Sequence, residues 1–195
     1  MNTDDKEIRL IATDLDGTLL NSRKEVPAEF EEWVCAHSGI KTVIASGRQY
    51  YNIRKLFPKA ADRMIYLAEN GGMVVENGEV IYACTIREED VLDCIERFQE
   101  KEGHVVIVCG EKSAYMCHAG EDAERNAHMY YENLKFVEDL RGCVQEDHMI
   151  KIAVFFGDYD ADTYYRGMEK VHDRLNVVLS GECWIDIANK EVCKG

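Results

Sequence analysis

The stretch Ile8–Leu20 reads IRLIATDLDGTLL. It begins with apolar and β-branched residues, which is typical of a strand buried on both faces, as in a parallel sheet. It then changes to Asp14-Leu15-Asp16-Gly17-Thr18, so that two carboxylates lie at the end of the strand. Buried carboxylates are costly unless a cation or a substrate needs them. A plain Asp-Gly turn is the alternative, and the pattern favours a functional site over it.

Two further predicted strands end in polar clusters. Lys41–Ala45 is followed by Ser46-Gly47-Arg48, and Met64–Ala68 is followed by Glu69-Asn70-Gly71-Gly72. Helical patterns separate the three strands, over 27–34 and Gln49–Phe57. Strands that alternate with helices predict an α/β fold with a parallel sheet, whose ligands bind at the carboxyl ends of the strands. The three clusters are therefore expected to line one crevice.

The pattern changes after a predicted hairpin, Met73–Val75 and Val80–Ala83, with Asn77-Gly78 as its turn. Glu88–Glu100 is an amphipathic helix with Val91, Cys94, Ile95 and Phe98 on one face. Further strands are predicted over Val105–Val108, Ala114–Cys117, Met149–Phe156, Val177–Ser180 and Trp184–Ala188, and helices over Glu121–Leu134 and Ala161–Leu175. These elements carry no carboxylate pair, so we predict a separate α+β domain over 85–189. It interrupts a core formed by 1–84, to which 190–195 return.

Composition and charge limit the possible partners. Of the 195 residues, 46% are hydrophobic and 31% charged, which is ordinary for a folded protein. The net charge of −14 argues against nucleic acid and anionic membranes, and makes any phosphate site depend on local cations. No apolar run could span a bilayer and no secretory segment begins the chain, so we expect a cytoplasmic protein. Eight cysteines without a CxxC pair predict reduced thiols, mostly in the core.

The strand-end clusters resemble, in order, the motifs of the haloacid dehalogenase (HAD) superfamily, and specifically of its Cof-like phosphatase branch. The matching segments are Asp14–Leu20, Ser46-Gly47-Arg48, Ala68–Gly72 and Lys194-Gly195. The family combines a Rossmannoid parallel-sheet core with an α+β cap, inserted where the second domain is predicted here. A serine that caps a helix and a charged C-terminal tail are the plain alternatives for Ser46 and Lys194.

The resemblance implies a role for each matching residue. Asp14 is expected to be the nucleophile and Asp16 the general acid and base, while Ser46 and Lys194 complete the phosphate cradle. Mg²⁺ is expected to bind the Asp14 side chain and the Asp16 carbonyl. Further substrate contacts are expected from Thr18, Gly47, Arg48 and Asn70.

The sequence departs from the family at its end. The fourth motif, with another metal-binding carboxylate, should follow Lys194, and Gly157-Asp158-Tyr159-Asp160 lies too early to replace it. We therefore expect a core cut short after the third motif, and an exposed apolar edge along Ile8–Thr13 that favours self-association.

The resulting hypothesis is a Mg²⁺-dependent phosphomonoester hydrolase that acts through an aspartyl-phosphate, with activity impaired by the missing motif. Its substrate is a phosphorylated small molecule that the sequence does not identify. A non-catalytic HAD remnant that binds phosphate or a partner is the alternative. A phospho-accepting receiver is disfavoured, because its acceptor lies on the third strand. The histidines lack ligand spacing, and Tyr130-Tyr131 and Tyr164-Tyr165 are expected to pack on helices.

Overall fold

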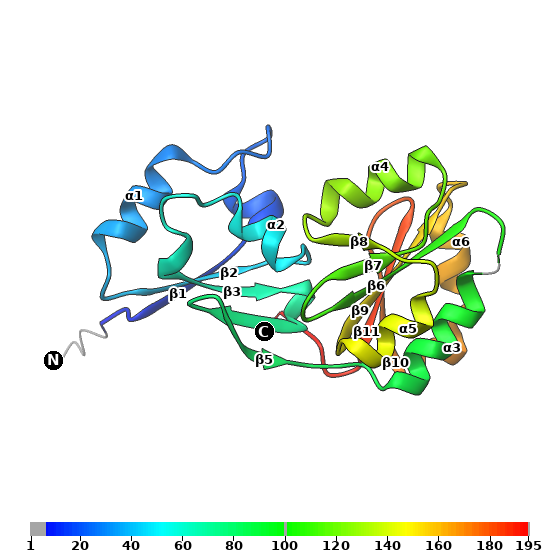
Figure 1. Ribbon diagram of the computed structural model, residues 1–195. Helices are drawn as coiled ribbons and strands as arrows, with labels where there is room; N and C mark the ends of the chain where they lie inside the picture. The colour runs from blue at the N-terminus through cyan, green and yellow to red at the C-terminus, as the bar shows by residue number, and fades with distance from the viewer. Residues whose placement is uncertain (1–6, 100, 195) are drawn as a thin grey trace, which may run out of the picture.

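Five strands form the first of two sheets in the computed structural model, which describes residues 7–99 and 101–194 (Figure 1). Their order is β1-β2-β3-β4-β5, with β1, β2 and β3 parallel and β4 and β5 antiparallel. The bounds are Leu10–Asp14, Lys41–Ala45, Met64–Ala68, Met73–Glu76 and Glu79–Ala83. Helices α1 (Ala28–Ala36) and α2 (Tyr50–Arg54) accompany them. We call these elements the first unit. The sequence predictions for residues 1–6, Glu100 and Gly195 lie outside the described residues.

The second unit contains a sheet in the order β10-β11-β9-β6-β7-β8. Its elements are α3 (Glu88–Gln99), β6 (His104–Gly110), β7 (Ala114–Met116), α4 (Glu121–Tyr130), β8 (Leu134–Phe136), α5 (Leu140–Glu146), β9 (Met149–Phe156), α6 (Ala161–Arg166), α7 (Glu169–His172), β10 (Leu175–Leu179) and β11 (Trp184–Asn189). The chain then returns to the first unit, as the red C-terminal segment in Figure 1 shows. The chain is thus an α/β protein, as predicted.

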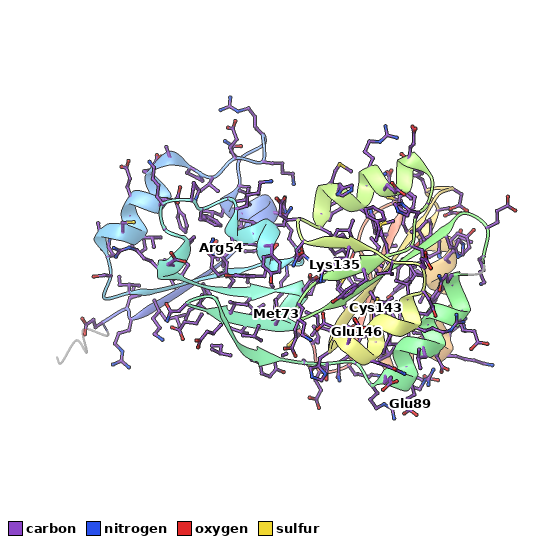
Figure 2. All side chains as sticks on the ribbon, in the orientation of Figure 1. Arg54, Met73, Glu89, Lys135, Cys143 and Glu146 are labelled. Carbon is purple, nitrogen blue, oxygen red and sulfur yellow. The ribbon has the colours of Figure 1, made fainter. Side chains whose placement is uncertain are left out.

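Each unit has its own apolar core. On the first sheet, alternate residues such as Ile44, Tyr66 and Met73 are buried against Ile53 of α2. On α3, the predicted apolar face of Val91, Cys94, Ile95 and Phe98 is buried. Met73 and Cys143 in Figure 2 lie in the two separate cores, whereas Glu89 lies at the outer surface. The thiols of Cys84, Cys94, Cys109 and Cys143 are free and buried, as expected of small core residues.

Strand β1 differs from its prediction. Leu10 is 54% exposed and Ile8 is 65% exposed, so the prediction of a strand buried on both faces is wrong. The reason is position: among the described residues β1 pairs only with β2 and forms the edge of the sheet. The expectation of an exposed apolar edge is confirmed for this part of the chain.

Several element ends also differ from prediction. The helix predicted over Glu121–Leu134 ends at Tyr130, because Leu134 pairs with Ala114 in the parallel β7–β8 ladder. The helix predicted over Ala161–Leu175 is interrupted at Gly167, and Leu175 begins β10. Helix α5 was not anticipated, and α2 is shorter than predicted. The hairpin prediction is confirmed, with Asn77 and Gly78 at φ 53° and 80° in its turn. In the part of the chain that the structure describes, no helix is both long and apolar enough to cross a bilayer.

Candidate active site

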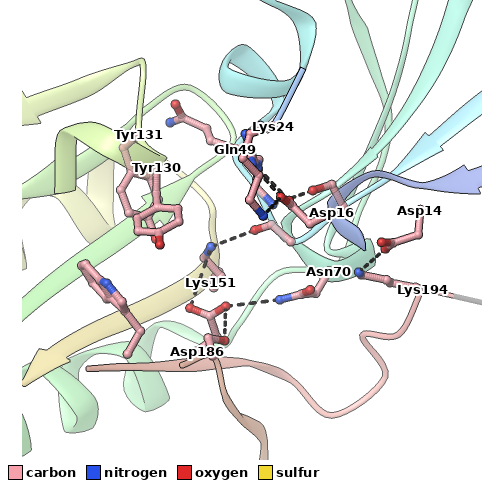
Figure 3. A pocket seen from close by; sticks show the side chains of 15 residues that line it. Asp14, Asp16, Lys24, Gln49, Asn70, Tyr130, Tyr131, Lys151, Asp186 and Lys194 are labelled. Carbon is pink, nitrogen blue, oxygen red and sulfur yellow. Dashed lines mark hydrogen bonds and ion pairs between the residues drawn. The ribbon is translucent and has the colours of Figure 1, made fainter. Parts of the chain in front are cut away.

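A cavity of about 380 Å³ opens between the two units (Figure 3). The first unit and the returning C-terminal segment line it with polar and charged residues: Asp14, Asp16, Lys24, Ser46, Gly47, Arg48, Gln49, Asn70 and Lys194. The second unit contributes Tyr130, Tyr131, Lys151, Ser180, Trp184 and Asp186. The three predicted strand-end clusters therefore meet at one cavity. Thr18 lies in the exposed turn after β1 and is not among the lining residues.

Asp14 is the last residue of β1, and its carboxylate pairs with Lys194. The Lys194 ammonium donates to Asp14 Oδ1 at 2.7 Å, across 180 residues of sequence. The side chain of Asp14 is 36% exposed and that of Lys194 is 44% exposed, so both remain accessible from the cavity. This contact favours the motif over the plain alternative of a charged C-terminal tail.

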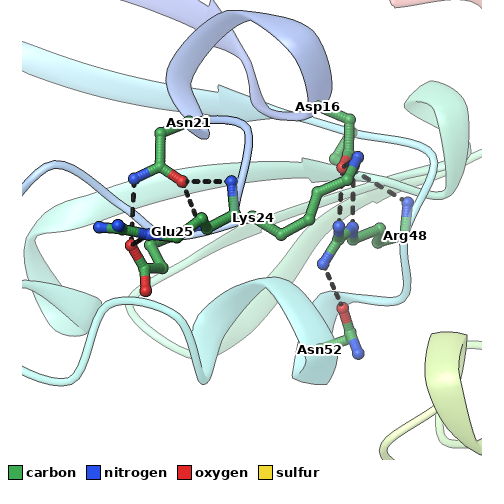
Figure 4. Close-up of polar contacts among 8 residues, drawn as sticks. Asp16, Asn21, Lys24, Glu25, Arg48 and Asn52 are labelled. Atoms are coloured by element: carbon green, nitrogen blue, oxygen red, sulfur yellow. Dashed lines mark hydrogen bonds and ion pairs between the residues drawn. The ribbon is translucent and has the colours of Figure 1, made fainter.

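Asp16 lies beside two cationic side chains (Figure 4). Arg48 donates from Nη2 to Oδ1 at 2.7 Å and from Nε to Oδ2 at 2.8 Å, and Lys24 donates to Oδ1 at 2.9 Å. Burial alone would raise the pKa of Asp16, but hydrogen bonds and charge from Arg48 and Lys24 outweigh it and hold the pKa below its ordinary value. Asp16 therefore rests as a carboxylate.

The loop after β1 is folded so that Lys24 reaches this carboxylate. Asn21 Oδ1 accepts from the backbone N–H groups of Arg23 and Glu25 at 2.8 and 3.1 Å, which closes a tight turn. Lys24 occupies the left-handed region at φ 63°. Lys24 could not be found from the sequence, because its loop carries no signal beyond polarity.

Ser46 is 2% exposed and follows β2. Its hydroxyl oxygen accepts from the Arg48 N–H at 3.2 Å, and its carbonyl accepts from the Asn70 N–H at 3.0 Å. Helix α2 begins later, at Tyr50, and its N-cap Gln49 makes no side-chain capping bond. The alternative in which Ser46 caps this helix is therefore wrong. Its backbone hydrogen bond with Asn70 instead connects the polar cluster after β2 to the one after β3.

The opposite wall of the cavity comes from the second unit. Two of its charged residues, Lys151 and Asp186, were not expected from the sequence. Lys151 lies on β9, and its ammonium forms an ion pair with Glu69 at 2.5 Å. Asp186 on β11 accepts from Asn70 Nδ2 at 3.3 Å. A lysine within the apolar run Met149–Phe156 was the signal that could have found this site, because lysine is almost never fully buried unless it is paired.

The tyrosine pair at the end of α4 has divided roles. Tyr131 is buried in the core of the second unit, where burial raises its pKa. Tyr130 is 43% exposed and lines the cavity, with its ring 6.1 Å from that of Trp184 at an interplanar angle of 77°. Tyr130 therefore packs against Trp184, as expected, and also faces the cavity.

The donor chemistry of the site fits Mg²⁺. Within the described ranges no group of three or more His, Cys, Asp or Glu side chains is arranged as a metal site. Mg²⁺ commonly uses only one or two carboxylates and keeps several waters. The part-exposed carboxylate of Asp14 is a hard oxygen donor of that kind, and a backbone carbonyl such as that of Asp16 is another by its chemistry. The residues present are compatible with the ion expected from the sequence.

Comparison with known proteins identifies the family of this chain. A family model described as haloacid dehalogenase-like hydrolase matches residues 11–195. The chain is 32% identical over 187 residues to the 5-amino-6-(5-phospho-D-ribitylamino)uracil phosphatase YbjI of Escherichia coli strain K12, covering 92% of this chain and 68% of that protein. It is 26% identical over 106 residues to the phosphatase YwpJ of Bacillus subtilis strain 168, covering 53% of this chain and 37% of that one.

Solved structures share the fold. SMU.1108c from Streptococcus mutans UA159 superposes with a TM-score of 0.80 at 23% identity, covering 96% of this chain and 73% of that chain. TM0651 from Thermotoga maritima superposes with a TM-score of 0.77 at 21% identity, covering 96% and 72%. At these identities the likeness establishes the architecture alone.

Proposed function

Because the chain belongs to the haloacid dehalogenase-like hydrolase family, we propose that it is a phosphatase that hydrolyses small phosphomonoesters with Asp14 as its nucleophile. The observation that carries this proposal is the meeting of two aspartates with Lys194, Arg48 and Lys24 at one cavity. In a chain of net charge −14, three cationic groups gathered at one point supply the local field that a phosphate needs. The second unit is then the cap over the phosphate site.

The proposed reaction has two steps. An Asp14 carboxylate oxygen attacks phosphorus, the bond to the leaving oxygen breaks, and Asp16 gives that oxygen a proton. Water then attacks the aspartyl-phosphate, Asp16 takes the proton, and phosphate leaves with Asp14 regenerated. Lys194 balances the charge that builds up beside Asp14, since phosphoryl transfer depends mainly on positioning and electrostatics.

The low pKa of Asp16 adds a condition to the first step. Asp16 must hold a proton before it can protonate a leaving group, and its contacts with Arg48 and Lys24 oppose this. A bound phosphoryl group competes for the same two cations. Substrate binding therefore raises the proton affinity of Asp16 at the moment when an acid is needed.

Mg²⁺ would be held by the Asp14 carboxylate and the Asp16 carbonyl, with waters in the remaining positions. When bound, it would neutralise charge on the phosphoryl oxygens.

The residues that the second unit contributes to the cavity favour a substrate with a flat ring in its leaving group. Tyr130 and Trp184 offer aromatic surface to the cavity, and Asp186 offers a carboxylate beside them. YbjI, the relative named for a phosphorylated ribitylaminouracil, makes such a compound the first to test. Tyr130→Ala should lower kcat/KM for this compound while hydrolysis of glycerol 3-phosphate changes little. Equal losses for both compounds would argue against ring recognition.

The test of the reaction is p-nitrophenyl phosphate hydrolysis with and without Mg²⁺, in the unaltered chain and in Asp14→Asn. Asp62→Asn is the matched control, because Asp62 is 79% exposed and pairs with Arg54 outside the cavity. We expect turnover that requires both Mg²⁺ and Asp14 and that survives Asp62→Asn. A rate unchanged by Asp14→Asn would exclude the proposed nucleophile.

A non-catalytic protein that binds phosphate is the second candidate, since Asp14 and Asp16 are both held in ion pairs, with Lys194 and with Arg48 and Lys24. Saturable binding of inorganic phosphate, lost in Lys194→Met, with no turnover of any ester would favour that candidate.

A further inference from the structure

The turn after β3 holds an unfavourable backbone conformation. Glu69, Asn70 and Gly71 have φ values of 51°, 58° and 98° in succession. Glycine accepts this left-handed region and asparagine tolerates it, but glutamate does not favour it. The Glu69 N–H donates to the Arg48 carbonyl at 3.1 Å and the Asn70 N–H to the Ser46 carbonyl at 3.0 Å. Such strain persists where the surroundings fix it, and it gathers at functional sites.

The strained turn places the Glu69 carboxylate between the two units, where it is 1% exposed. Its partner is Lys151 on β9, which also donates to the Gly47 carbonyl at 3.3 Å and lies 5.2 Å from the centre of the Tyr131 ring. The preceding residue on β9, Ile150, is buried in the apolar core of the first unit. One end of β9 therefore connects the second unit to the loop after β2, at Gly47, and to the turn after β3, at Glu69.

The buried charges are not balanced by this one lysine. Asp186 Oδ1 lies 4.0 Å from the Lys151 ammonium, so a single cation faces two carboxylates. Burial alone would lower the pKa of Lys151, but Asp186 and Glu69 outweigh it and keep the ammonium charged. Burial raises the pKa of Glu69, and Lys151 offsets this only in part. Removing Lys151 would leave two acids in the interface without their shared cation.

Stability alone does not account for this arrangement. A buried ion pair is often no more stabilising than apolar residues of the same volume, because desolvation cancels the attraction. The interface already contains other links, such as Gln49 with Asn133 at 2.8 and 3.0 Å and Lys55 with Glu132 at 2.9 Å. What the Lys151 pair adds is a direct connection from the cap to the backbone of Gly47, beside Ser46.

We propose that Lys151 is a positioning residue of the phosphatase: through Glu69 and the Gly47 carbonyl it holds the Ser46–Gly47 loop against Asp14 when the cap lies over the site. This inference rests on the proposed function for its catalytic part. Its structural part, the coupling of the cap to the two strand-end loops, stands independently. Lys151 acts through these loops and not on the phosphoryl group itself.

The test compares Lys151→Met, the double variant Lys151→Met/Glu69→Gln, and Lys55→Met. The double variant removes both members of the pair with side chains of similar size, so it restores folding if the single change leaves Glu69 unpaired. Lys55→Met is the matched control, because it removes an ion pair that also joins the two units but is 66% and 44% exposed.

Two measurements are made on each variant: kcat and KM for p-nitrophenyl phosphate, and hydrogen exchange of the Glu69 and Asn70 amides. We expect the double variant to unfold at the temperature of the unaltered chain, to lose at least about tenfold in kcat with a smaller change in KM, and to exchange these amides at least about tenfold faster. Lys55→Met should change neither. A folded double variant with unaltered kcat and exchange would overturn the proposal.

The two proposals fail in different ways. If the unaltered chain hydrolyses no ester, the proposed function fails, and faster exchange in the double variant alone would still support the coupling. If the unaltered chain is active and the double variant matches it in both measurements, only the role of Lys151 is lost.

Discussion

Gly71 is the position where one added methyl group should disturb the proposed site most. Its φ is +98°, and a Cβ built there would lie 2.0 Å from the carbonyl oxygen of Cys193 and 2.8 Å from its carbonyl carbon. Both atoms belong to backbone, which cannot rotate away as a side chain can. The residue after Cys193 is Lys194, whose ammonium lies 2.7 Å from Asp14 Oδ1. In Gly71→Ala the returning segment must therefore move.

The size of the effect follows from these distances. Normal contact requires the Cys193 carbonyl to shift by about 1 Å, which would stretch the Lys194–Asp14 contact beyond hydrogen-bond length. A misplacement of about 1 Å can cost roughly 10²-fold in rate. The alanine also adopts an unfavourable φ, which costs about 1–3 kcal/mol of stability. We expect kcat for p-nitrophenyl phosphate to fall by between about 10- and 100-fold, with a lower unfolding midpoint in urea.

Gly78→Ala is the control. Gly78 has φ +80° in the turn between β4 and β5, and an added Cβ would meet nothing within 4 Å. The backbone cost is thus matched while the steric clash is absent, so Gly78→Ala should lose stability and keep its rate. If Gly71→Ala remains folded with an unaltered kcat, the reasoning from turn to lysine to nucleophile is refuted.

Three further predictions use other parts of the molecule. Lys194→Met should lower kcat by about 10²–10³-fold, whereas Lys190→Met should not, and equal losses in phosphatase assays would contradict the role of Lys194. The lowered folded pKa of Asp16 means that its contribution to stability is present above the ordinary pKa of 3.8 and is lost as the pH falls through the folded pKa. The difference in urea midpoint between the unaltered chain and Asp16→Asn should therefore be steady near neutral pH and shrink as the pH falls below about 4. A difference that stays constant on acidification would argue against it. The exposed edge of β1 predicts self-association that Leu10→Lys reduces, and light scattering that finds a clean monomer at high concentration would contradict this.

Much of the first unit could be predicted from the sequence because its signals are local. A short apolar strand followed by a polar cluster needs only neighbouring residues to be recognised, and β2, β3 and the Asn77-Gly78 turn lie where those signals placed them. The ends of strands in a parallel sheet share one edge, so the meeting of Asp14, Ser46 and Asn70 also followed. Two predicted helices run too far because Leu134 pairs with Ala114 and Leu175 with Asn189 in strand ladders, so tertiary pairing overrode local helix propensity.

The side of the cavity formed by the second unit could not be predicted in this way, because its contacts join residues far apart in the sequence. Lys151 pairs with Glu69 and Asp186 with Asn70, and no periodicity in either segment indicates its partner. The cause is the docking of the second unit onto the first, which depends on the packing of both. Charge at a buried position is visible in sequence, but the residue that neutralises it is not.

The one irregularity that sequence did offer was the lysine within Met149–Phe156. Every other residue of β9 agrees with a strand buried on both faces, and all eight are buried in the structure. A sequence that is consistent at every level except one position directs attention to that position, because natural proteins break local rules chiefly where function requires it. The same holds for Glu69, which occupies a backbone conformation that glutamate does not favour. These two exceptions form an ion pair with each other, so each residue has its explanation in the other unit, beside the cavity that contains Asp14.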